Sequence, residues 1–270
     1  MRVGIVGLGL IGGSLGLALR RLRHAIDVTG VARQAESAAE AIQRGAVDRA
    51  STDLAELSDC DIVVIATPIE EIAGVMERLA PIVGANALIT DVASVKRPVL
   101  AWAQRLPYPS RFLGGHPVAG KTRSGLRESD AEIFDHEPWI FTPAEGQDVR
   151  RFDTWFEMVR AIGASVSFMH PDLHDEQMAF LSHLAFVVSS AYAQTVKRQA
   201  DETLGGPGYR GMVRLAGGDP AMYEAISREN RDALVDAIDR FDAVLHQYRQ
   251  RISAGTRVKD LFGGAVHAGR

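Results

Sequence analysis

The sequence predicts a doubly wound α/β domain with a mostly parallel sheet, followed by an all-helical domain. Up to Met169, short apolar runs alternate with helical patterns, which is typical of parallel strands covered by helices on both faces. After His170-Pro171 the chain shows helical periodicity and no strand pattern. The 270 residues are long for a single core, so we expect two domains, over residues 1–168 and 169–270.

Short runs rich in β-branched and apolar residues predict the strands of the first domain, over residues 2–6, 27–32, 61–66, 87–90, 111–114, 139–142 and 165–169. Apolar residues at helical spacing predict helices over residues 12–22, 36–43 and 69–79. In the second domain, an Ala- and Leu-rich stretch predicts one long helix with a broad buried face, over residues 172–198. Glycine-rich breaks at 205–208 and 217–220 accompany further expected helices, over residues 207–216, 221–246 and 247–253.

The composition is that of an ordinary globular protein, with 46% hydrophobic and 24% charged residues and a net charge of −4. Basic and acidic residues are interspersed, so we expect neither a nucleic-acid-binding patch nor a membrane-binding surface. Glycines interrupt the apolar N-terminus, which therefore does not resemble a signal peptide, and no uninterrupted apolar run reaches membrane-spanning length. The single Cys60 cannot form an internal disulfide, so we expect a packed thiol in a cytoplasmic protein.

The first expected strand is followed by a GxGxxG motif, Gly7-Leu8-Gly9-Leu10-Ile11-Gly12, which opens the first helix. In this strand–turn–helix context the motif is typical of dinucleotide binding. Gly7 permits the tight turn, Gly9 lets the backbone approach the pyrophosphate, and Gly12 lets the helix pack closely against the strand. A glycine-rich turn without a ligand is the alternative interpretation.

The end of the second strand indicates which dinucleotide binds. Enzymes that use NAD usually carry Asp or Glu there to bind the ribose 2′-hydroxyl, whereas this chain reads Gly30-Val31-Ala32-Arg33-Gln34. A guanidinium suits a 2′-phosphate because it offers a planar fork of donors. We therefore expect NADP, bound by Arg33, with NAD and a solvated Arg33 as the alternative. Thr67-Pro68 ends the third strand and is expected to line the nicotinamide side.

The segment Gly114-Gly115-His116-Pro117-Val118-Ala119-Gly120 places a histidine at the end of an expected strand, between glycines that let a ligand approach the imidazole. Beside a bound nicotinamide, neutral His116 would accept a proton while a hydride leaves the same carbon, which indicates a dehydrogenase that acts on an alcohol. Asp91-Val92-Ala93-Ser94-Val95-Lys96 follows another strand at the ligand-binding edge of the sheet. Ser94 is therefore expected to hydrogen-bond the substrate hydroxyl or His116, and capping of the next helix is its alternative role.

Several polar side chains precede and open the long helix, namely His170, His174, Asp175 and His183. In a regular α-helix, His174 and His183 are about two and a half turns apart and lie on opposite faces, so we expect no metal site. Asp175 is expected to stabilise the start of its own helix. A histidine on an apolar helix is usually a hydrogen-bonded core residue, so its spacing alone assigns His183 no function.

Arg210 and Arg214 are about one helical turn apart and share a helix face. An arginine that faces the cleft between the domains would bind a substrate carboxylate through two hydrogen bonds. Ordinary surface charge is the alternative interpretation of this pair.

Taken together, a set of motifs resembles the prephenate/arogenate dehydrogenase family of tyrosine biosynthesis, from Arg2 to about Asn230: GLGLIGGSL, Thr67-Pro68, DVASVK, GGHPVAG, HPDLHD, SHL and YRGMVRLAGGDP. The resemblance implies a Rossmann domain followed by a helical domain that forms a homodimer. It also implies NAD(P)-dependent oxidative decarboxylation of prephenate to 4-hydroxyphenylpyruvate, of arogenate to tyrosine, or of both. The stretch Val31-Ala32-Arg33-Gln34 is most similar to the branch that uses NADP and arogenate.

The resemblance implies a catalytic pair, His116 and Ser94, and a set of residues that contact the substrate: Arg214 at its carboxylate, His183 in the SHL motif, Arg210 and Thr122. The chain departs from the family pattern at two places near the substrate's side chain. Many members continue SHL with Pro-His, and many carry an acidic residue where this chain has Lys121-Thr122-Arg123. The choice between prephenate and arogenate therefore stays open.

Two other functions also stay open on the sequence. A 3-hydroxyacid or 6-phosphogluconate-type dehydrogenase shares the layout but uses a lysine acid/base on the helical domain, where the long helix offers only Lys197, near its far end. A non-catalytic NADP-sensing protein would need neither His116 nor Ser94.

Overall fold

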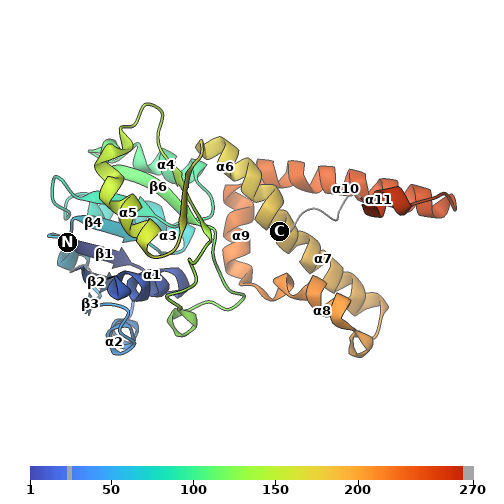
Figure 1. Cartoon of the computed structure of the whole chain (residues 1–270), viewed down its shortest axis with the longest axis horizontal. Coiled ribbons are helices and arrows are strands. Elements are labelled where there is room, and N and C mark those ends of the chain that lie inside the picture. The colour runs from blue at the N-terminus through green and yellow to red at the C-terminus, as the bar shows by residue number, and fades with distance from the viewer. Residues whose placement is uncertain (23–25, 264–270) are drawn as a thin grey trace.

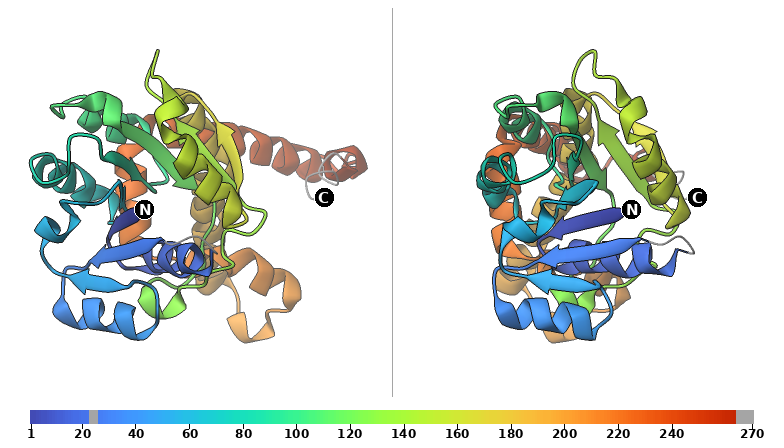
Figure 2. Two further views of the ribbon diagram at one scale, coloured as in Figure 1. Left: turned by 60° about the vertical axis from the view of Figure 1, so that its left-hand side comes forward. Right: turned by 90° about the vertical axis from the view of Figure 1, so that its left-hand side faces the viewer.

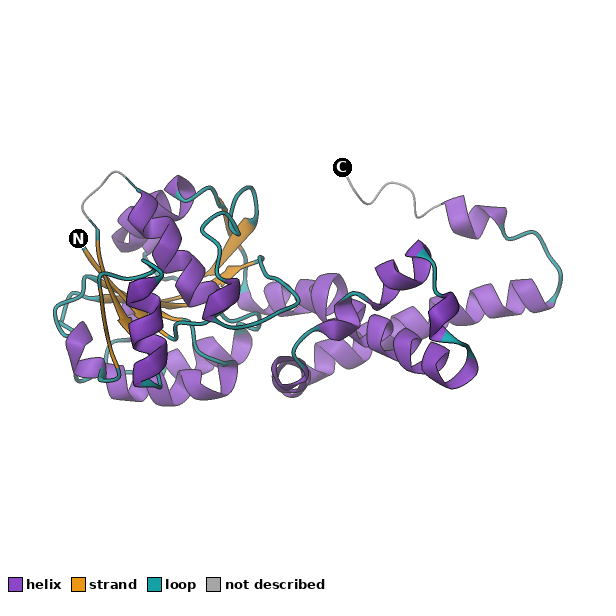
Figure 3. Cartoon of the chain, turned by 90° about the horizontal axis from the view of Figure 1, so that it is seen from below, coloured by secondary structure: helices purple, strands orange, loops and turns teal. Residues whose placement is uncertain are grey.

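The chain folds into an α/β half and a helical half (Figure 1), and the computed structural model describes residues 1–22 and 26–263. The strands, all in the α/β half (Figure 3), are β1 (Arg2–Val6), β2 (Asp27–Val31), β3 (Arg49–Ser51), β4 (Ile62–Ile65), β5 (Leu88–Asp91), β6 (Phe112–Pro117), β7 (Pro138–Thr142) and β8 (Ser165–Phe168). The helices of this half are α1 (Leu10–Arg21), α2 (Ala35–Gln43), α3 (Ile69–Leu79), α4 (Arg97–Ala103) and α5 (Asp153–Ala161). The helical half consists of α6 (Pro171–Met178), α7 (Leu184–Gln199), α8 (Pro207–Val213), α9 (Pro220–Glu229), α10 (Arg231–Ser253) and α11 (Lys259–Gly263). The end of the expected second domain, residues 264–270, lies outside the described residues.

The sheet confirms the doubly wound, mostly parallel arrangement that the sequence predicts. Its strand order is β3-β2-β1-β4-β5-β6-β7-β8, and among the described strands only β6 and β7 pair antiparallel. The order reverses between β1 and β4, so the carboxyl ends of these strands border the crevice in which open α/β sheets bind ligands. Helices cover both faces of the sheet (Figure 2), which is why β4 is a continuous run of buried Ile and Val.

Two hydrophobic cores, one on each face of the sheet, stabilise the α/β half. Helices α1, α2 and α5 contribute to one core, and α3 and α4 contribute to the other. Ala225 and Ile226 of α9 belong to this second core. Apolar packing therefore joins the helical half to the α/β half.

Most of the expected elements of the α/β half are confirmed, with small shifts of their ends. β1 and α3 have the expected bounds, whereas β6 continues to Pro117. The sequence analysis did not predict β3 or α5, and it gave no bounds for the helix expected after Ser94, which is α4. β3 is a short edge strand, Arg-Ala-Ser, whose residues show no apolar alternation.

The helical half differs from expectation at three places. The single long helix expected over residues 172–198 is interrupted, because a π-helical segment, Ala179–His183, joins α6 to α7. The region expected as one helix over 221–246 is divided at Asn230, whose φ of −117° and ψ of 33° end α9. α10 then continues past residue 246, since neither Gly nor Pro interrupts it there.

In the single chain, without a partner, the helical half exposes many large apolar side chains. The stretch Pro171–Gln199 is long and apolar enough to cross a membrane by length and composition alone, and only 17% of its most apolar window is buried. Leu181 in this stretch is 70% exposed, and α10 exposes Leu245 and Ile252. Many exposed apolar side chains on one half of a protein are typical of a face that a second protein chain covers.

Candidate active site

The glycine-rich loop after β1 has the shape that a dinucleotide pyrophosphate requires. Gly7 has a φ of 97°, and a Cβ there would meet the carbonyl oxygen of Ala66 at 2.5 Å. A Cβ on Gly12 would collide with the carbonyl oxygen of Gly7, so α1 packs closely against the turn. Gly9 is open, because a Cβ there would meet no described atom within 4 Å. Gly9 is the N-cap of α1, whose first turn carries no acidic residue, so the helix N-terminus can bind an anion.

The other residues predicted to bind the cofactor lie at the same edge of the sheet. Leu8 is buried beneath the loop, and Leu10 and Ile11 are half-buried at the start of α1. Arg33 follows β2; its side chain is 83% exposed and lies 3.7 Å from Glu71, so the guanidinium is accessible to an anion. Thr67 and Pro68 follow β4, and Thr67 Oγ1 is buried without a hydrogen-bond partner among the described residues.

His116 lies in β6 and is 7% exposed. The glycines before it have a different role from the predicted one. A Cβ on Gly114 would collide with Thr142, and a Cβ on Gly115 would meet the carbonyl oxygen of Asp91 at 2.8 Å. Gly114 and Gly115 are therefore required for the close packing of β6 between its neighbours, and the expectation that they leave space for a ligand is wrong.

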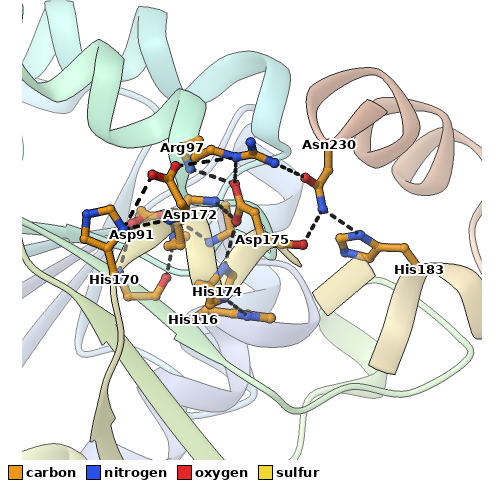
Figure 4. A network of polar contacts seen from close by, with 12 residues as sticks. Asp91, Arg97, His116, His170, Asp172, His174, Asp175, His183 and Asn230 are labelled. Atoms are coloured by element: carbon orange, nitrogen blue, oxygen red, sulfur yellow. Dashed lines mark hydrogen bonds and ion pairs between the residues drawn. The ribbon is translucent and has the colours of Figure 1, made fainter. Parts of the chain in front are cut away.

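His116 is the first member of a buried chain of hydrogen bonds (Figure 4). Its Nδ1 lies 2.9 Å from Nε2 of His174, and Nδ1 of His174 lies 2.8 Å from Oδ1 of Asp175. His174 and Asp175 are both 0% exposed. The structure thus connects an imidazole at the end of the sheet to a carboxylate at the start of α6 through a second imidazole.

The carboxylate of Asp175, at the end of this series of hydrogen bonds, fixes the position of each proton. An ionised Asp175 only accepts, so Nδ1 of His174 carries the proton of that hydrogen bond. Nε2 of neutral His174 is then a lone pair, and it accepts the proton on Nδ1 of His116. Nε2 of neutral His116 therefore carries a lone pair, and no described residue hydrogen-bonds it.

The pKa shifts agree with this assignment of protons. Burial lowers the pKa of His116 well below 6.5, and the nearby His174, Lys96 and His183 lower it further. Burial also lowers the pKa of His174, although Asp175 opposes this shift. Burial raises the pKa of the Asp175 carboxyl, but hydrogen bonds from His174 and from two backbone N–H groups outweigh burial and leave that pKa below its usual value. Near neutral pH, His116 is therefore neutral and Asp175 is ionised.

Asp175 also hydrogen-bonds the N-terminus of α4. Its carboxylate accepts from the backbone N–H of Lys96 at 2.7 Å and from that of Arg97 at 2.9 Å, groups with no partner inside α4. The N-cap of α6 is His170, so the expectation that Asp175 stabilises the start of its own helix is wrong. The carboxylate instead links the helical half to the α/β half.

Lys96 and Asp91 form a buried ion pair that supports the backbone beside His116. Nζ of Lys96 donates to Oδ2 of Asp91 and, at 2.6 Å, to the carbonyl oxygen of Gly115. Oδ1 of Asp91 accepts from the backbone N–H of Gly115 at 3.1 Å. Burial lowers the pKa of Lys96, and Asp91 opposes that shift. The ion pair fixes both backbone groups of the residue that precedes His116.

His183 joins the same cluster because its helix is not regular. A π turn takes more residues than the about 3.6 of an α-helical turn, so Ala179–His183 rotates His183 toward the side of His174. The expectation that these two histidines lie on opposite faces is therefore wrong. Nδ1 of His183 lies 3.3 Å from Nδ2 of Asn230, and Nδ2 also donates to the carbonyl oxygen of Asp175 at 2.8 Å.

The remaining predicted site residues are not brought into this cluster. Ser94 is half-buried between β5 and α4; among the described residues it neither caps α4 nor hydrogen-bonds His116, whose Nδ1 is bound by His174. Thr122 is exposed after β6. Arg210 and Arg214 are exposed at α8, which packs on α7 rather than on the sheet (Figure 1). One chain therefore does not place either arginine beside His116.

The sequence analysis assigned no role at the active site to several polar residues of the cluster. Two of them carried a local signal, since Lys96 closes the DVASVK motif and His174 directly precedes an aspartate. Asn230 carried no signal, because its partners Arg97, Asp175 and His183 are distant in the sequence.

Comparisons with known proteins identify the family of this chain. A family model described as the nucleotide-binding domain of prephenate dehydrogenase matches residues 15–168, and one described as the dimerization domain matches residues 170–262. Prephenate dehydrogenase of Bacillus subtilis is 30% identical over 245 residues, which cover 88% of this chain and 66% of the relative's length. This chain therefore spans just under two thirds of that relative.

Two crystal structures are similar over nearly the whole chain. Synechocystis arogenate dehydrogenase has a TM-score of 0.80 and 33% identity, over 94% of this chain and 93% of that one. Prephenate dehydrogenase from Aquifex aeolicus, in complex with hydroxyphenyl propionate and NAD+, has a TM-score of 0.88 and 29% identity, over 94% and 91% of the two chains.

Proposed function

Because this chain belongs to the prephenate dehydrogenase family, we propose that it catalyses the NADP-dependent oxidative decarboxylation of prephenate, of arogenate, or of both. The product is 4-hydroxyphenylpyruvate from prephenate and tyrosine from arogenate. The observation that carries this proposal is the buried His116–His174–Asp175 chain, which leaves a neutral histidine with a free lone pair at the ligand-binding edge of the sheet. Oxidation of a ring carbinol needs such a base to take the hydroxyl proton.

His116 is the general base of the proposed reaction. Its Nε2 accepts the proton of the substrate hydroxyl as the carbinol carbon is oxidised. His174 and ionised Asp175 stabilise the positive charge that forms on the His116 imidazole, through the two hydrogen bonds of the chain. The oxidised nicotinamide, when bound, supplies the acceptor for the hydride. The ring carboxylate then leaves as carbon dioxide, and the electron pair of the broken carbon–carbon bond makes the ring an aromatic phenolate, so the overall step is effectively irreversible. The phenolate oxygen takes the proton back from Nε2 of His116, which gives the phenol and restores the neutral base.

Other side chains orient the substrate in this proposal. Ser94 hydrogen-bonds the substrate hydroxyl, because its loop follows β5 at the edge where His116 lies. Arg214 binds the substrate carboxylate, with Arg210 and Thr122 near the substrate's side chain. Since α8 packs away from the sheet in one chain, the arginines can reach the substrate only through a second chain or a movement of α8.

The residues at the crevice between the carboxyl ends of β1 and β4 fit a nicotinamide dinucleotide. The open backbone at Gly9 and the unobstructed N-terminus of α1 suit the pyrophosphate. The accessible Arg33 guanidinium, with no carboxylate in its place, suits a ribose 2′-phosphate and thus NADP over NAD.

The lysines do not favour the alternative hydroxyacid dehydrogenase chemistry. Of the lysines that the structure describes, Lys96 alone is buried, and its Nζ is bound by Asp91 and Gly115. Lys197 is exposed on α7. Neither is placed as a substrate acid or base.

Turnover by the purified chain tests the proposed function. With NADP and either prephenate or arogenate, we expect formation of NADPH and release of carbon dioxide in equal amounts. Binding of NADP without turnover of either compound would contradict the proposal and support a sensor.

We also propose that the chain acts as a cytoplasmic homodimer. Residues 1–168 bind the dinucleotide, and residues 169–270 bind substrate and the second chain. The exposed apolar side chains of the helical half, such as Leu181 and Ile252, supply the surface that a partner chain would cover.

Replacement of Arg33 by alanine is expected to weaken NADP about ten- to a hundredfold and to change NAD much less, since only NADP carries the phosphate that the guanidinium contacts. The measurement is KM for both cofactors in wild type and variant. Arg105→Ala, at another exposed arginine, is the matched control and should change neither KM. Equal losses for both cofactors, or a wild-type preference for NAD, would show that Arg33 does not select the cofactor.

Replacement of Arg214 by glutamine is expected to raise KM for the dienyl acid about tenfold or more while the Kd for NADP stays unchanged, because a carboxylate loses a charged partner. Arg198→Gln, at an exposed arginine on α7, is the control. A normal KM in the Arg214 variant would show that Arg214 is an ordinary surface charge that does not bind the substrate. Arg210 would then be tested next.

A further inference from the structure

Asn230 connects three elements where the two halves of the chain meet. It lies between α9 and α10 and is 1% exposed. Its Oδ1 accepts from Nη2 of Arg97 at 3.0 Å, and its Nδ2 donates to the carbonyl oxygen of Asp175 at 2.8 Å. Nδ2 also lies 3.3 Å from Nδ1 of His183 (Figure 4).

These partners fix the orientation of the Asn230 amide. A guanidinium only donates and a backbone carbonyl only accepts, so the amide oxygen faces Arg97 and the amide nitrogen faces Asp175 and His183. Nδ1 of His183 therefore faces an N–H donor and must be a lone pair. In the neutral imidazole, the proton then resides on Nε2.

The Nε2–H group of His183 is left without a partner. Nε2 is buried and forms no hydrogen bond with any described residue, although a buried N–H donor without an acceptor is costly. Burial lowers the pKa of His183 to about 4; Asp175 opposes that shift and His174 adds to it. The ring is therefore neutral near pH 7. A neutral donor beside the proposed base is available to an acceptor on a ligand.

We propose that Asn230 is a positioning residue that holds His183 as the Nε2–H tautomer, so that this N–H donates a hydrogen bond to an oxygen of the bound dienyl carboxylate. The assignment of that acceptor rests on the proposed function. The hydrogen bond from Arg97 prevents the amide from rotating, and α4 thereby determines which proton His183 presents. Asn230 itself contacts neither the substrate nor the cofactor.

The first experiment uses the ligand-free wild-type protein and does not depend on any activity. The ¹⁵N and ¹H NMR signals of the His183 imidazole, assigned by comparison with His183→Gln, report which nitrogen carries the proton. We expect a protonated Nε2 and an unprotonated Nδ1 across neutral pH. A protonated Nδ1 would overturn the inference, whether or not the protein turns over prephenate or arogenate.

The second experiment exchanges the amide donor for an acceptor with Asn230→Asp. Oδ1 can still accept from Arg97, but the second carboxylate oxygen now faces Nδ1 of His183 and draws a proton to it. At low pH the imidazolium keeps its Nε2–H and binds substrate. As pH rises through the increased pKa of His183, Nε2 loses its proton, and KM should rise about tenfold or more. Wild-type KM should not change over the same range.

Control variants separate this effect from a loss of structure. Asn230→Asp/His183→Gln presents an amide that does not titrate, so its KM should be independent of pH. Asn86→Asp adds the same charge at an exposed loop and should behave as wild type. A KM in Asn230→Asp that is raised equally at every pH, or not raised at all, would overturn the inference. If neither substrate is turned over by wild type, the proposed function fails, while the NMR result still decides the role of Asn230.

Discussion

His116→Ala is expected to lower kcat roughly 10²–10⁴-fold, the contribution that proton transfer to a positioned base typically makes. The variant removes Nε2, the nitrogen whose lone pair the chain through His174 to Asp175 leaves free. The Kd for NADP should stay unchanged, because the glycine-rich loop follows β1 and Arg33 follows β2, whereas His116 lies in β6. Steady-state NADPH formation and a binding titration with NADP measure the two quantities.

His246→Ala is the matched control for this variant, since His246 is exposed on α10. It should leave kcat and the Kd for NADP at their wild-type values. A near-normal kcat in His116→Ala would make His116 a structural histidine, and the proposed mechanism would be wrong.

Asp175→Asn is expected to lower kcat by up to about 10⁴-fold, the size of effect that the same exchange has in the Ser-His-Asp triad of a serine protease. If the amide nitrogen takes the position of Oδ1, it faces Nδ1 of His174 and favours a proton on Nε2 of that ring, and the hydrogen bond from the backbone N–H of Lys96 at the start of α4 is also lost. Nδ1 of His116 must then accept the proton on Nε2 of His174, so the proton of neutral His116 moves to its own Nε2. That nitrogen no longer has the lone pair that would accept the substrate proton. If the amide nitrogen takes the position of Oδ2, it faces the backbone N–H of Arg97 and destabilises the start of α4.

Two readouts follow these effects. The kcat reports the state of the base and distinguishes the two orientations, whereas the Tm is expected to fall in either one, because each loses a backbone contact between Asp175 and α4. Asp172→Asn, at an exposed carboxylate one turn earlier in α6, should leave both quantities unchanged. Wild-type kcat in Asp175→Asn would show that the carboxylate does not set the tautomer of His116.

Local patterns were sufficient to predict most of the α/β half. β4 is a run of apolar residues because both of its faces are covered, and α3 has the 3.6-residue spacing of an amphipathic helix. β3 could not be predicted in this way, because a short edge strand is formed by its pairing with β2 and not by its own side chains. The π turn at Ala179–His183 was also out of reach, since α- and π-helices share one apolar pattern over so few residues.

In the candidate site, too, residues in contiguous motifs could be predicted and residues brought together by tertiary packing could not. His116 and the glycine-rich loop belong to contiguous motifs, and the sequence identified both. The partners of His116 could not be identified from spacing, because His174 lies 58 positions away and meets it only when α6 packs against β6. Asn230 is further removed, at 133 positions from Arg97. Such contacts depend on tertiary packing. The regular helix assumed for His174 and His183 placed the two side chains on opposite faces, so the analysis did not expect them in one cluster.

The pH dependence of kcat/KM tests the central claim that neutral His116 is the base. Protonation of His116 removes the lone pair, so kcat/KM falls as pH decreases through its pKa, which burial holds well below 6.5. Wild type should therefore keep a constant kcat/KM from neutral pH down past 6.5 and lose it only at lower pH, and His116→Ala should lack this decrease. A wild-type midpoint at or above 6.5, or the same decrease in His116→Ala, would contradict the account.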